Sequence, residues 1–180
     1  MNDAELIKLF RESENPEKAF DAIVSAYGER LYWHIRKMVI SHDDANDILQ
    51  NSLIKAWRGL PNFREEAKLY TWLYRIATNE VITFLKKHRT HLFQPLSKVS
   101  KQLGETLLAD PLFNGDDVQL KLQKAILSLP NRQRQVFNMR YFDDLKYEEI
   151  SEILNTSVGA LKASYHHAAA KIEEYMKQQI

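Results

Sequence analysis

The residues best suited to contact another molecule lie near the carboxyl end of the chain, between Ser157 and Lys171. Lysine, serine and histidine donors are interleaved there with alanines, and no carboxylate occurs from Ser157 to Ile172. Small residues let a backbone approach a partner closely, and a donor-bearing surface without acids suits phosphates and base edges. The stretch therefore indicates a nucleic-acid contact. Its candidate residues are Ser157, Ala160, Lys162, Ala163, Ser164, His166 and His167.

Two short helices separated by a tight turn would position these residues. Apolar residues at spacings of three and four predict a first helix over 146–154 and a second that begins after Ser157. Asn155 suits the left-handed position past a helix end, and the Ser157 hydroxyl can cap the next helix. This pattern is typical of a DNA-reading helix-turn-helix. An ordinary helical hairpin would use the same turn, so the pattern alone leaves both interpretations open.

Two further stretches have an unusual charge. No acid occurs from Val81 to Gly104, a segment that carries five lysines and arginines, whereas three aspartates crowd residues 43–47. Tyr70, Trp72 and Tyr74 lie beside Arg75 just before the basic segment. Aromatic rings next to cations suit unpaired bases and their phosphates, although we expect Trp72 to be half-buried in the core. The asymmetry predicts one polyanionic partner and one basic partner.

The periodicity predicts an all-α fold made of two small helical domains joined by a flexible linker. Helices are expected over 3–10, 16–40, 43–58 and 68–89, then from about 118 and over 131–141, and nothing indicates a strand. Residues 92–117 contain two prolines and two glycines without a sustained period, and read as the linker. The domains are therefore 1–91 and 118–180, the second a helix-turn-helix domain that is winged-helix-like without the wing.

Composition excludes several classes of protein. The 180 residues contain no cysteine, which removes disulfides and thiolate chemistry, and no apolar run approaches the ~20 residues that span a bilayer. Asp43, Asp44 and Asp47 do not converge as a metal site would on a helix, and no glycine-rich phosphate loop or nucleophile motif occurs. We expect a cytoplasmic protein without cofactor, metal, small-molecule substrate, membrane insertion or enzymatic activity.

Taken in order, three motifs resemble the extracytoplasmic-function sigma factors of bacterial RNA polymerase. They are DDANDILQNSLIKAW at 43–57, LYTWLYRIATNEVITFLKKHR at 69–89, and LSLPNRQRQVFNMRYFDDLKYEEISEIL at 127–154 followed by SVGALK at 157–162. The resemblance covers about residues 16–171, apart from the linker. It implies a transcription initiation factor whose partners are core RNA polymerase, through its β′ coiled coil and β subunit, promoter DNA, and an anti-sigma factor.

The resemblance also implies roles for individual residues. Asp44, Asp47 and Gln50 fall where the family docks onto the β′ coiled coil. The loop 63–69 matches the one that captures a flipped base of the −10 element, and residues 160–166 match the helix that enters the major groove at the −35 element. The −10 residues implied by this match are Phe63, Arg64, Lys68, Tyr74, Asn79, Lys86, Lys87 and Arg89.

Some positions depart from the family pattern. Asn51 stands where a glutamate is usual, Lys146 replaces the usual serine or threonine cap at a cost of about 1 kcal/mol, and Ser164 and His167 replace arginines of the recognition helix. Two other accounts stay open at this point. A stand-alone helix-turn-helix regulator would bind its DNA without polymerase, and a helical adaptor would leave the acid-free stretches unexplained.

Fewer fixed cations on the recognition helix should make the −35 contact comparatively weak. We therefore expect Lys162→Ala to lower promoter affinity only modestly and to reduce the slope of log affinity against log salt by about 1. Binding of the polymerase-bound protein to labelled promoter DNA at several salt concentrations measures both quantities. A steep loss of binding from this one substitution would contradict the expectation.

Overall fold

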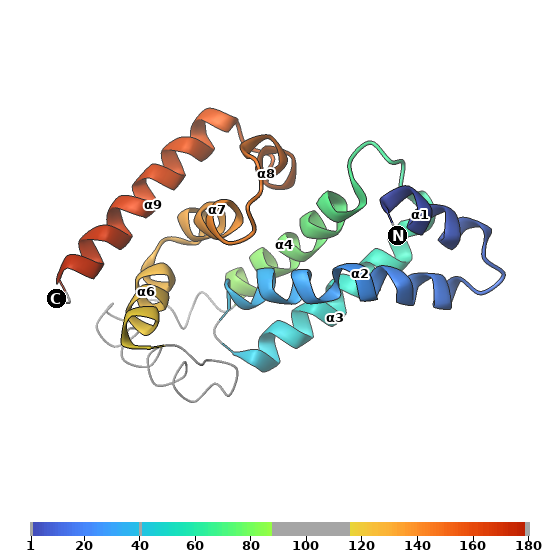
Figure 1. Cartoon of the computed structure of the whole chain (residues 1–180), viewed down its shortest axis with the longest axis horizontal. Helices are drawn as coiled ribbons and strands as arrows, with labels where there is room; N and C mark the ends of the chain where they lie inside the picture. Colours follow the sequence, from blue (N-terminus) through green and yellow to red (C-terminus); the bar gives the residue numbers. More distant parts are fainter. Residues whose placement is uncertain (1, 40, 88–115, 179–180) are drawn as a thin grey trace.

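The computed structural model describes residues 2–39, 41–87 and 116–178, and every regular element in these ranges is helical (Figure 1). No helix of the described residues is long and apolar enough to span a membrane. The elements are α1 (Asp3–Glu12), α2 (Pro16–Arg36), α3 (His42–Gly59), the 3₁₀ turn η1 (Leu60–Asn62), α4 (Leu69–Lys87), α6 (Asp117–Ser128), α7 (Asn131–Tyr141), α8 (Tyr147–Leu154) and α9 (Val158–Gln178).

The first bundle packs α2, α3 and α4 against one another, with α1 lying against α2. Its core contains Leu31, Ile48 and Leu73, all buried as the helical spacing predicts, together with buried aromatic rings. Ser41 caps α3 as expected, since its hydroxyl accepts from the backbone N–H of Asp44 at 3.3 Å.

The second helix is shorter than its sequence pattern indicates. Apolar residues at helical spacing continue to Val39, but α2 ends at Arg36. Met38 and Val39 stay buried in a turn that follows the helix. Periodicity reports which side chains are buried and cannot distinguish a last helical turn from a tight bend that buries the same residues.

The second bundle contains the helix-turn-helix that the sequence predicts. Helices α6, α7 and α8 all pack on α9, and α8 and α9 are separated by the turn at residues 155–157. Asn155 has φ 49° and ψ 54°, the left-handed conformation expected of it. The Ser157 hydroxyl accepts from the N–H of Ala160 at 3.3 Å and so caps α9. Both turn predictions are confirmed.

The two bundles pack directly on each other. Val136 and Met139 of α7 and Ile150 and Ile153 of α8 belong to the same buried apolar cluster as the first bundle. A smaller cluster around Ile126, Phe137 and Ile172 holds α6, α7 and α9 together. The expected linker, 92–117, lies outside the described residues except for its last two, where Asp116 caps α6.

The left-handed residue in the turn offers a test of this local geometry. Asn155→Ala should destabilise the protein by about 1 kcal/mol, because alanine tolerates positive φ poorly, whereas Asn155→Gly should be close to neutral. Thermal unfolding of the two variants measures the difference. Equal stability of both would show that the turn does not require this conformation.

Candidate nucleic-acid interface

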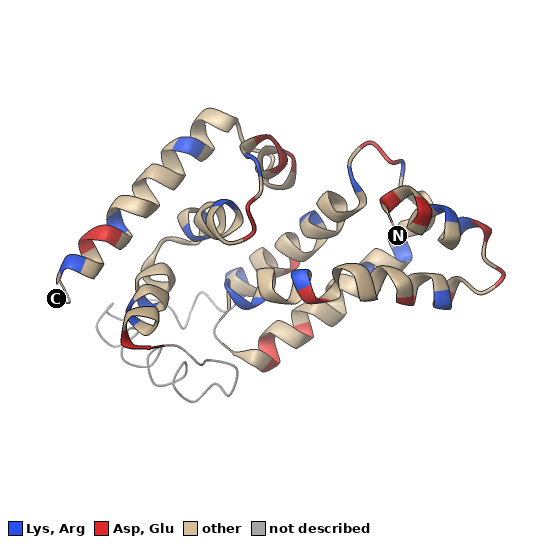
Figure 2. Cartoon of the chain, in the orientation of Figure 1, with Lys and Arg blue, Asp and Glu red and all other residues tan. Residues whose placement is uncertain are grey.

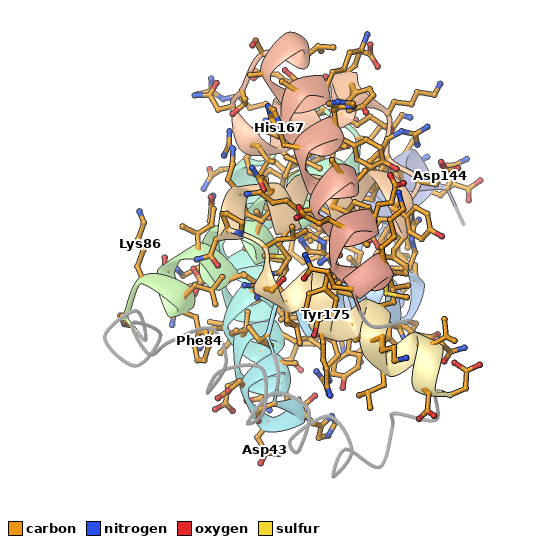
Figure 3. All side chains as sticks on the ribbon, turned by 90° about the vertical axis from the view of Figure 1, so that its left-hand side faces the viewer. Asp43, Phe84, Lys86, Asp144, His167 and Tyr175 are labelled. Atoms are coloured by element: carbon orange, nitrogen blue, oxygen red, sulfur yellow. The ribbon has the colours of Figure 1, made fainter. Side chains whose placement is uncertain are left out.

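Helix α9 presents the predicted recognition residues to solvent. Ala160, Lys162, Ala163, His166 and His167 are exposed, and Ser164 is half-buried, while Leu161 and Ala168 on the opposite side are buried. From Val158 to Ala170 the helix carries Lys162 as its one lysine or arginine and no acid, and Figure 2 shows this half of the helix mostly uncharged. Figure 3 shows His167 on this helix. The arrangement leaves one continuous donor-bearing face without carboxylates for a DNA groove.

The predicted −10 residues are more varied in their placement. Arg64, Lys68, Asn79, Lys86 and Lys87 are exposed, and Lys86 extends away from the end of α4 (Figure 3). Arg89 lies outside the described residues.

Two aromatic −10 candidates face inward. Phe63 is buried with its ring 5.0 Å from that of Trp72, which is itself half-buried as expected. Tyr74 is only 1% exposed, and its hydroxyl donates to the carbonyl of Arg30 at 3.4 Å. Its ring packs beside His34 of α2, so Tyr74 holds α4 against α2 and is not accessible to a DNA strand. The sequence did not reveal this, because aromatic residues at helical spacing serve cores and stacking surfaces alike.

The acidic group predicted to meet a basic partner lies on the outer face of α3. Asp47 and Gln50 are exposed and Asp44 is half-buried. Figure 2 shows acidic residues near the start of α3. The adjacent Asn51 is also exposed, so a glutamate at that position would extend the same face.

Helix α8 of the second bundle occupies part of the α4 surface. The Glu149 carboxylate accepts hydrogen bonds from the Tyr70 hydroxyl and, at 3.4 Å, from the Lys68 ammonium. The Arg75 guanidinium donates to the carbonyl of Glu152 at 2.7 Å. The groups that suit a single strand of DNA are thus engaged by the other half of the same chain.

The ionisation of this contact reflects its partial burial. Burial by itself would raise the pKa of Glu149, but hydrogen bonds from Tyr70, from the backbone of Lys146 and from Lys68 outweigh it and lower that pKa. Burial and the neighbouring Glu149 carboxylate raise the pKa of Tyr70 to about 12. Glu149 also accepts from the Lys146 N–H at 2.9 Å, which is the half of a capping box that the third helical residue makes back to the cap residue.

A buried carboxylate joins the two bundles at the end of α2. Asp143, whose side chain is 6% exposed, lies 2.5 Å from the Lys37 ammonium and 3.1 Å from Nδ1 of His34. A carboxylate only accepts, so Nδ1 carries the proton, and Nε2 lies 3.0 Å from the Thr78 hydroxyl. These contacts link the turn after α7 to α2 and α4.

Asp143 is held in its charged form. Burial opposes its ionisation, but the hydrogen bond and charge of His34, followed by those of Lys37, hold the pKa of this carboxyl below its ordinary value. A carboxyl with a depressed folded pKa contributes stability above its unfolded pKa, near pH 4, and loses it as the pH falls through the folded pKa. The contact is therefore fully formed at neutral pH.

The same interface contains polar groups that are not satisfied. Arg134 is 8% exposed and meets only carbonyl and amide oxygens, among them the carbonyl of Met38 at 3.2 Å, and its Nε has no partner. Burial lowers the pKa of Arg134 to about 10. Asn138 donates to the carbonyl of Lys37, but its buried Oδ1 also lacks a partner. Each such group costs about 1–3 kcal/mol, which partly offsets the Asp143 contacts.

The sequence pattern does not single out His34 or Asp143. One signal was present, because His34 follows Leu31 by three positions within a stripe that the pattern assigns to the core. A histidine buried there requires hydrogen-bond partners. Nothing in the sequence says that one of them lies 109 residues further along the chain.

The fold and exposed surfaces define a two-part, all-helical DNA-binding protein with a carboxyl-terminal helix-turn-helix. Residues 23–91 match the family model described as sigma-70 region 2, and residues 119–172 match that of sigma-70 region 4. The chain therefore belongs to the sigma-70 family, and it is a sigma factor of the extracytoplasmic-function type, a class of transcription initiation factors.

Relatives support this assignment over most of the chain. The chain is 29% identical to the ECF RNA polymerase sigma factor SigW of Bacillus subtilis, with 89% of this chain and 90% of the relative aligned. It is 28% identical to the RNA polymerase sigma-H factor of Pseudomonas aeruginosa over 97% of this chain and 94% of that protein.

Two solved structures share the fold. The sigma factor RpoE, in complex with the anti-sigma factor NepR from Bartonella quintana, superposes with a TM-score of 0.69 at 21% identity, covering 89% of this chain and 98% of that one. CnrH, in complex with the cytosolic domain of CnrY, gives a TM-score of 0.71 at 21% identity, covering 99% of both chains.

The interface around Asp143 generates a direct prediction. Asp143→Asn removes the buried charge opposite Lys37 and should weaken the packing of the two bundles by about 1–3 kcal/mol. We expect a larger radius of gyration in small-angle X-ray scattering and faster amide hydrogen exchange in α8. Asp144→Asn is the matched control, because the Asp144 carboxylate is 92% exposed and pairs with Arg140 of α7. Identical behaviour of the two variants would show that Asp143 does not hold the bundles together.

Proposed function

We propose that this sigma factor binds core RNA polymerase and directs it to promoters, with a separate surface for each task. The observation that carries the proposal is that the two matched regions each present exposed residues of the required chemistry. Asp44, Asp47 and Gln50 on α3 form the docking face for the basic β′ coiled coil, and a further contact to the β subunit completes the assembly. No catalytic residue is needed, because binding energy alone can shift an opening equilibrium that costs a few kcal/mol per base.

In this proposal the first bundle reads the −10 element. The loop after η1 takes an unstacked base, with Arg64 and Lys68 exposed on it, and Asn79 lies further along α4. Lys86, Lys87 and Arg89 follow the backbone beyond it. Phe63 is the buried first residue of this loop, and Tyr74 is a buried residue of α4. Both therefore support the exposed residues without contacting DNA themselves.

The second bundle holds the −35 element through α9. Its face from Ser157 to His167 enters the major groove, where Lys162 is the one fixed cation among the recognition residues. The Lys162 ammonium lies 5.8 Å from the centre of the Tyr147 ring, which orients it at the start of the helix.

The contact between α8 and α4 sets a condition on this function. The Glu149 carboxylate accepts hydrogen bonds from Tyr70 and Lys68, the donors that a DNA phosphate would use. The second bundle must therefore leave α4 before a single strand can bind there. Nε of Arg134 and Oδ1 of Asn138 have no hydrogen-bond partner in the packed form and would gain one from water if the bundles separated. This gain favours separation of the two bundles. We include an anti-sigma factor among the partners, because a protein that stabilises the packed form would hold the sigma factor inactive.

Run-off transcription from a randomised promoter library, with purified core polymerase and with or without this protein, tests the function. We expect transcripts that appear only when the protein is added, and their sequences give both promoter elements. If core polymerase gains no initiation while the protein binds a DNA site alone, the stand-alone regulator replaces the sigma factor as the account.

The docking face makes opposite predictions for two neighbouring positions. Asp47→Asn should weaken binding to core polymerase and Asn51→Glu should strengthen it, each by up to about fivefold, since both change one exposed charge facing a basic partner. Fluorescence anisotropy of the labelled protein with core polymerase measures the affinities. Asn51→Gln controls for side-chain length, and a change in the same direction for both charge variants would contradict the assignment.

A further inference from the structure

Helix α1 lies before the region that matches sigma-70 region 2, yet it contacts both ends of the loop over residues 63–68. At the far end, Asp3 accepts a hydrogen bond from the N–H of Leu69, the first residue of α4, at 2.9 Å. The other oxygen of this carboxylate accepts from the Tyr27 hydroxyl of α2. Asp3 therefore caps α4 from a different helix and ties that cap to the core of the bundle.

Arg11 holds the near end of the loop. One nitrogen of its guanidinium donates to the carbonyl of Phe63 at 2.7 Å, and the other lies 2.5 Å from the carboxylate of Glu65. A planar guanidinium that meets two acceptors at once fixes their relative positions as well as their distance. Phe63 is anchored in turn by its buried ring, so the guanidinium fastens the exposed loop to a fixed point.

The backbone of Glu65 has an unfavourable conformation that the contact with Arg11 can stabilise. Its φ is 60°, in the left-handed region that residues other than glycine, asparagine and aspartate seldom adopt. Strained residues of this kind persist where surrounding contacts impose them. Arg11 supplies such a contact, because it binds the Glu65 side chain and the backbone two residues earlier.

The loop and α1 together line a cavity of about 470 Å³. Asp3, Ala4 and Ile7 form the wall from α1, and the opposite wall comes from residues 65–69 and Thr71. Glu149 and Glu152 of α8 also border it when the two bundles are packed together. The volume lies within the range of about 300–1,000 Å³ that small-ligand sites show. This volume belongs to the packed form, in which Glu149 and Glu152 close the cavity to DNA. Once α8 leaves, the wall from α1 stays beside the loop that would take an unstacked base.

We propose that α1 is a brace for the base-capturing loop, in which Asp3 and Arg11 are positioning residues and α1 forms one wall of the base pocket. The inference rests on the proposed function, since it assigns to α1 control of a loop that takes a promoter base. Preorganising the loop removes the cost of ordering it when the base arrives, so the brace favours open promoter DNA and sharpens the choice of base.

The test compares Arg11→Ala and Arg11→Lys with the wild type, using Lys8→Ala as the matched control. Lys8 also belongs to α1, but its side chain is 71% exposed and pairs with Glu12 of the same helix. Each protein is assembled with core polymerase, and permanganate reactivity of unpaired thymines reports the open complex. Transcripts from a library randomised at the −10 positions report the base preference.

Arg11→Ala is expected to reduce the open complex by up to about fivefold, the limit for an exposed ion pair, and to flatten the preference at one −10 position. Arg11→Lys should restore part of both, because an ammonium keeps the charge and loses the second, fixed contact. Lys8→Ala should match the wild type. Binding to core polymerase should be equal in all four proteins.

Three results would overturn the inference. Wild-type opening and base preference in Arg11→Ala would show that the loop does not depend on α1. A lower melting temperature with a proportional loss of transcripts and an unchanged base preference would reduce Arg11 to an ordinary stabilising contact. Failure of the wild-type protein itself to open promoters with core polymerase would overturn the proposed function, and the brace with it, and is distinguished by affecting all four proteins.

Discussion

A buried carboxylate must be paired, and the arrangement of this protein follows from how Asp143 is paired. Its partners, His34 and Lys37, lie at the end of α2, and His34 is itself fixed by Thr78 of α4. If the second bundle moved away, Asp143 would exchange both partners for water, while His34 would lose the acceptor for its Nδ1 proton. Helices α2 and α4 of the first bundle and the turn after α7 are thus coupled through a single charge.

The same junction shows why the packed form can separate. Apolar residues of α7 and α8 continue the core of the first bundle, which favours packing, but Arg134 is buried without a carboxylate and Asn138 leaves one acceptor unmatched. The favourable apolar packing and the unfavourable burial of these polar groups oppose each other, so the net free energy of packing the two bundles is small. Binding of a DNA strand or a partner protein can then reverse its sign. Glu149 makes the competition specific, because it engages Tyr70 and Lys68 on the α4 surface.

Helix α1 and helix α8 border the same loop cavity from two sides and act on it differently. The contacts of α1 remain when the second bundle departs, because the hydrogen-bond partners of Asp3 and Arg11 belong to the first bundle. They are Leu69, Tyr27, Phe63 and Glu65. The contacts of α8 exist only in the packed form. A base pocket in which α1 stays in place and α8 can leave would be preorganised, and it would stay closed to DNA until the second bundle departs.

The sequence by itself determined the local structure and the family. The helical stripes, the left-handed Asn155, the Ser41 and Ser157 caps and the exposed donors of α9 each depend on residues within a few positions of one another, so their chemistry can be read along the chain. The motifs at 43–57, 69–89 and 127–162 predicted a sigma factor for the same reason. Such signals do not depend on how the bundles are placed.

Only the tertiary structure decided which of these surfaces are accessible. It buried Tyr74, ended α2 at Arg36, placed Glu149 on Tyr70 and brought Asp143 to His34 across 109 residues of sequence. It also joined α1 to a loop more than 50 residues away, through Arg11 and Glu65. Contacts of this range depend on the path of the whole chain, and hydrophobic periodicity carries no information about that path, because it fixes which face of a helix is buried and leaves open what covers it.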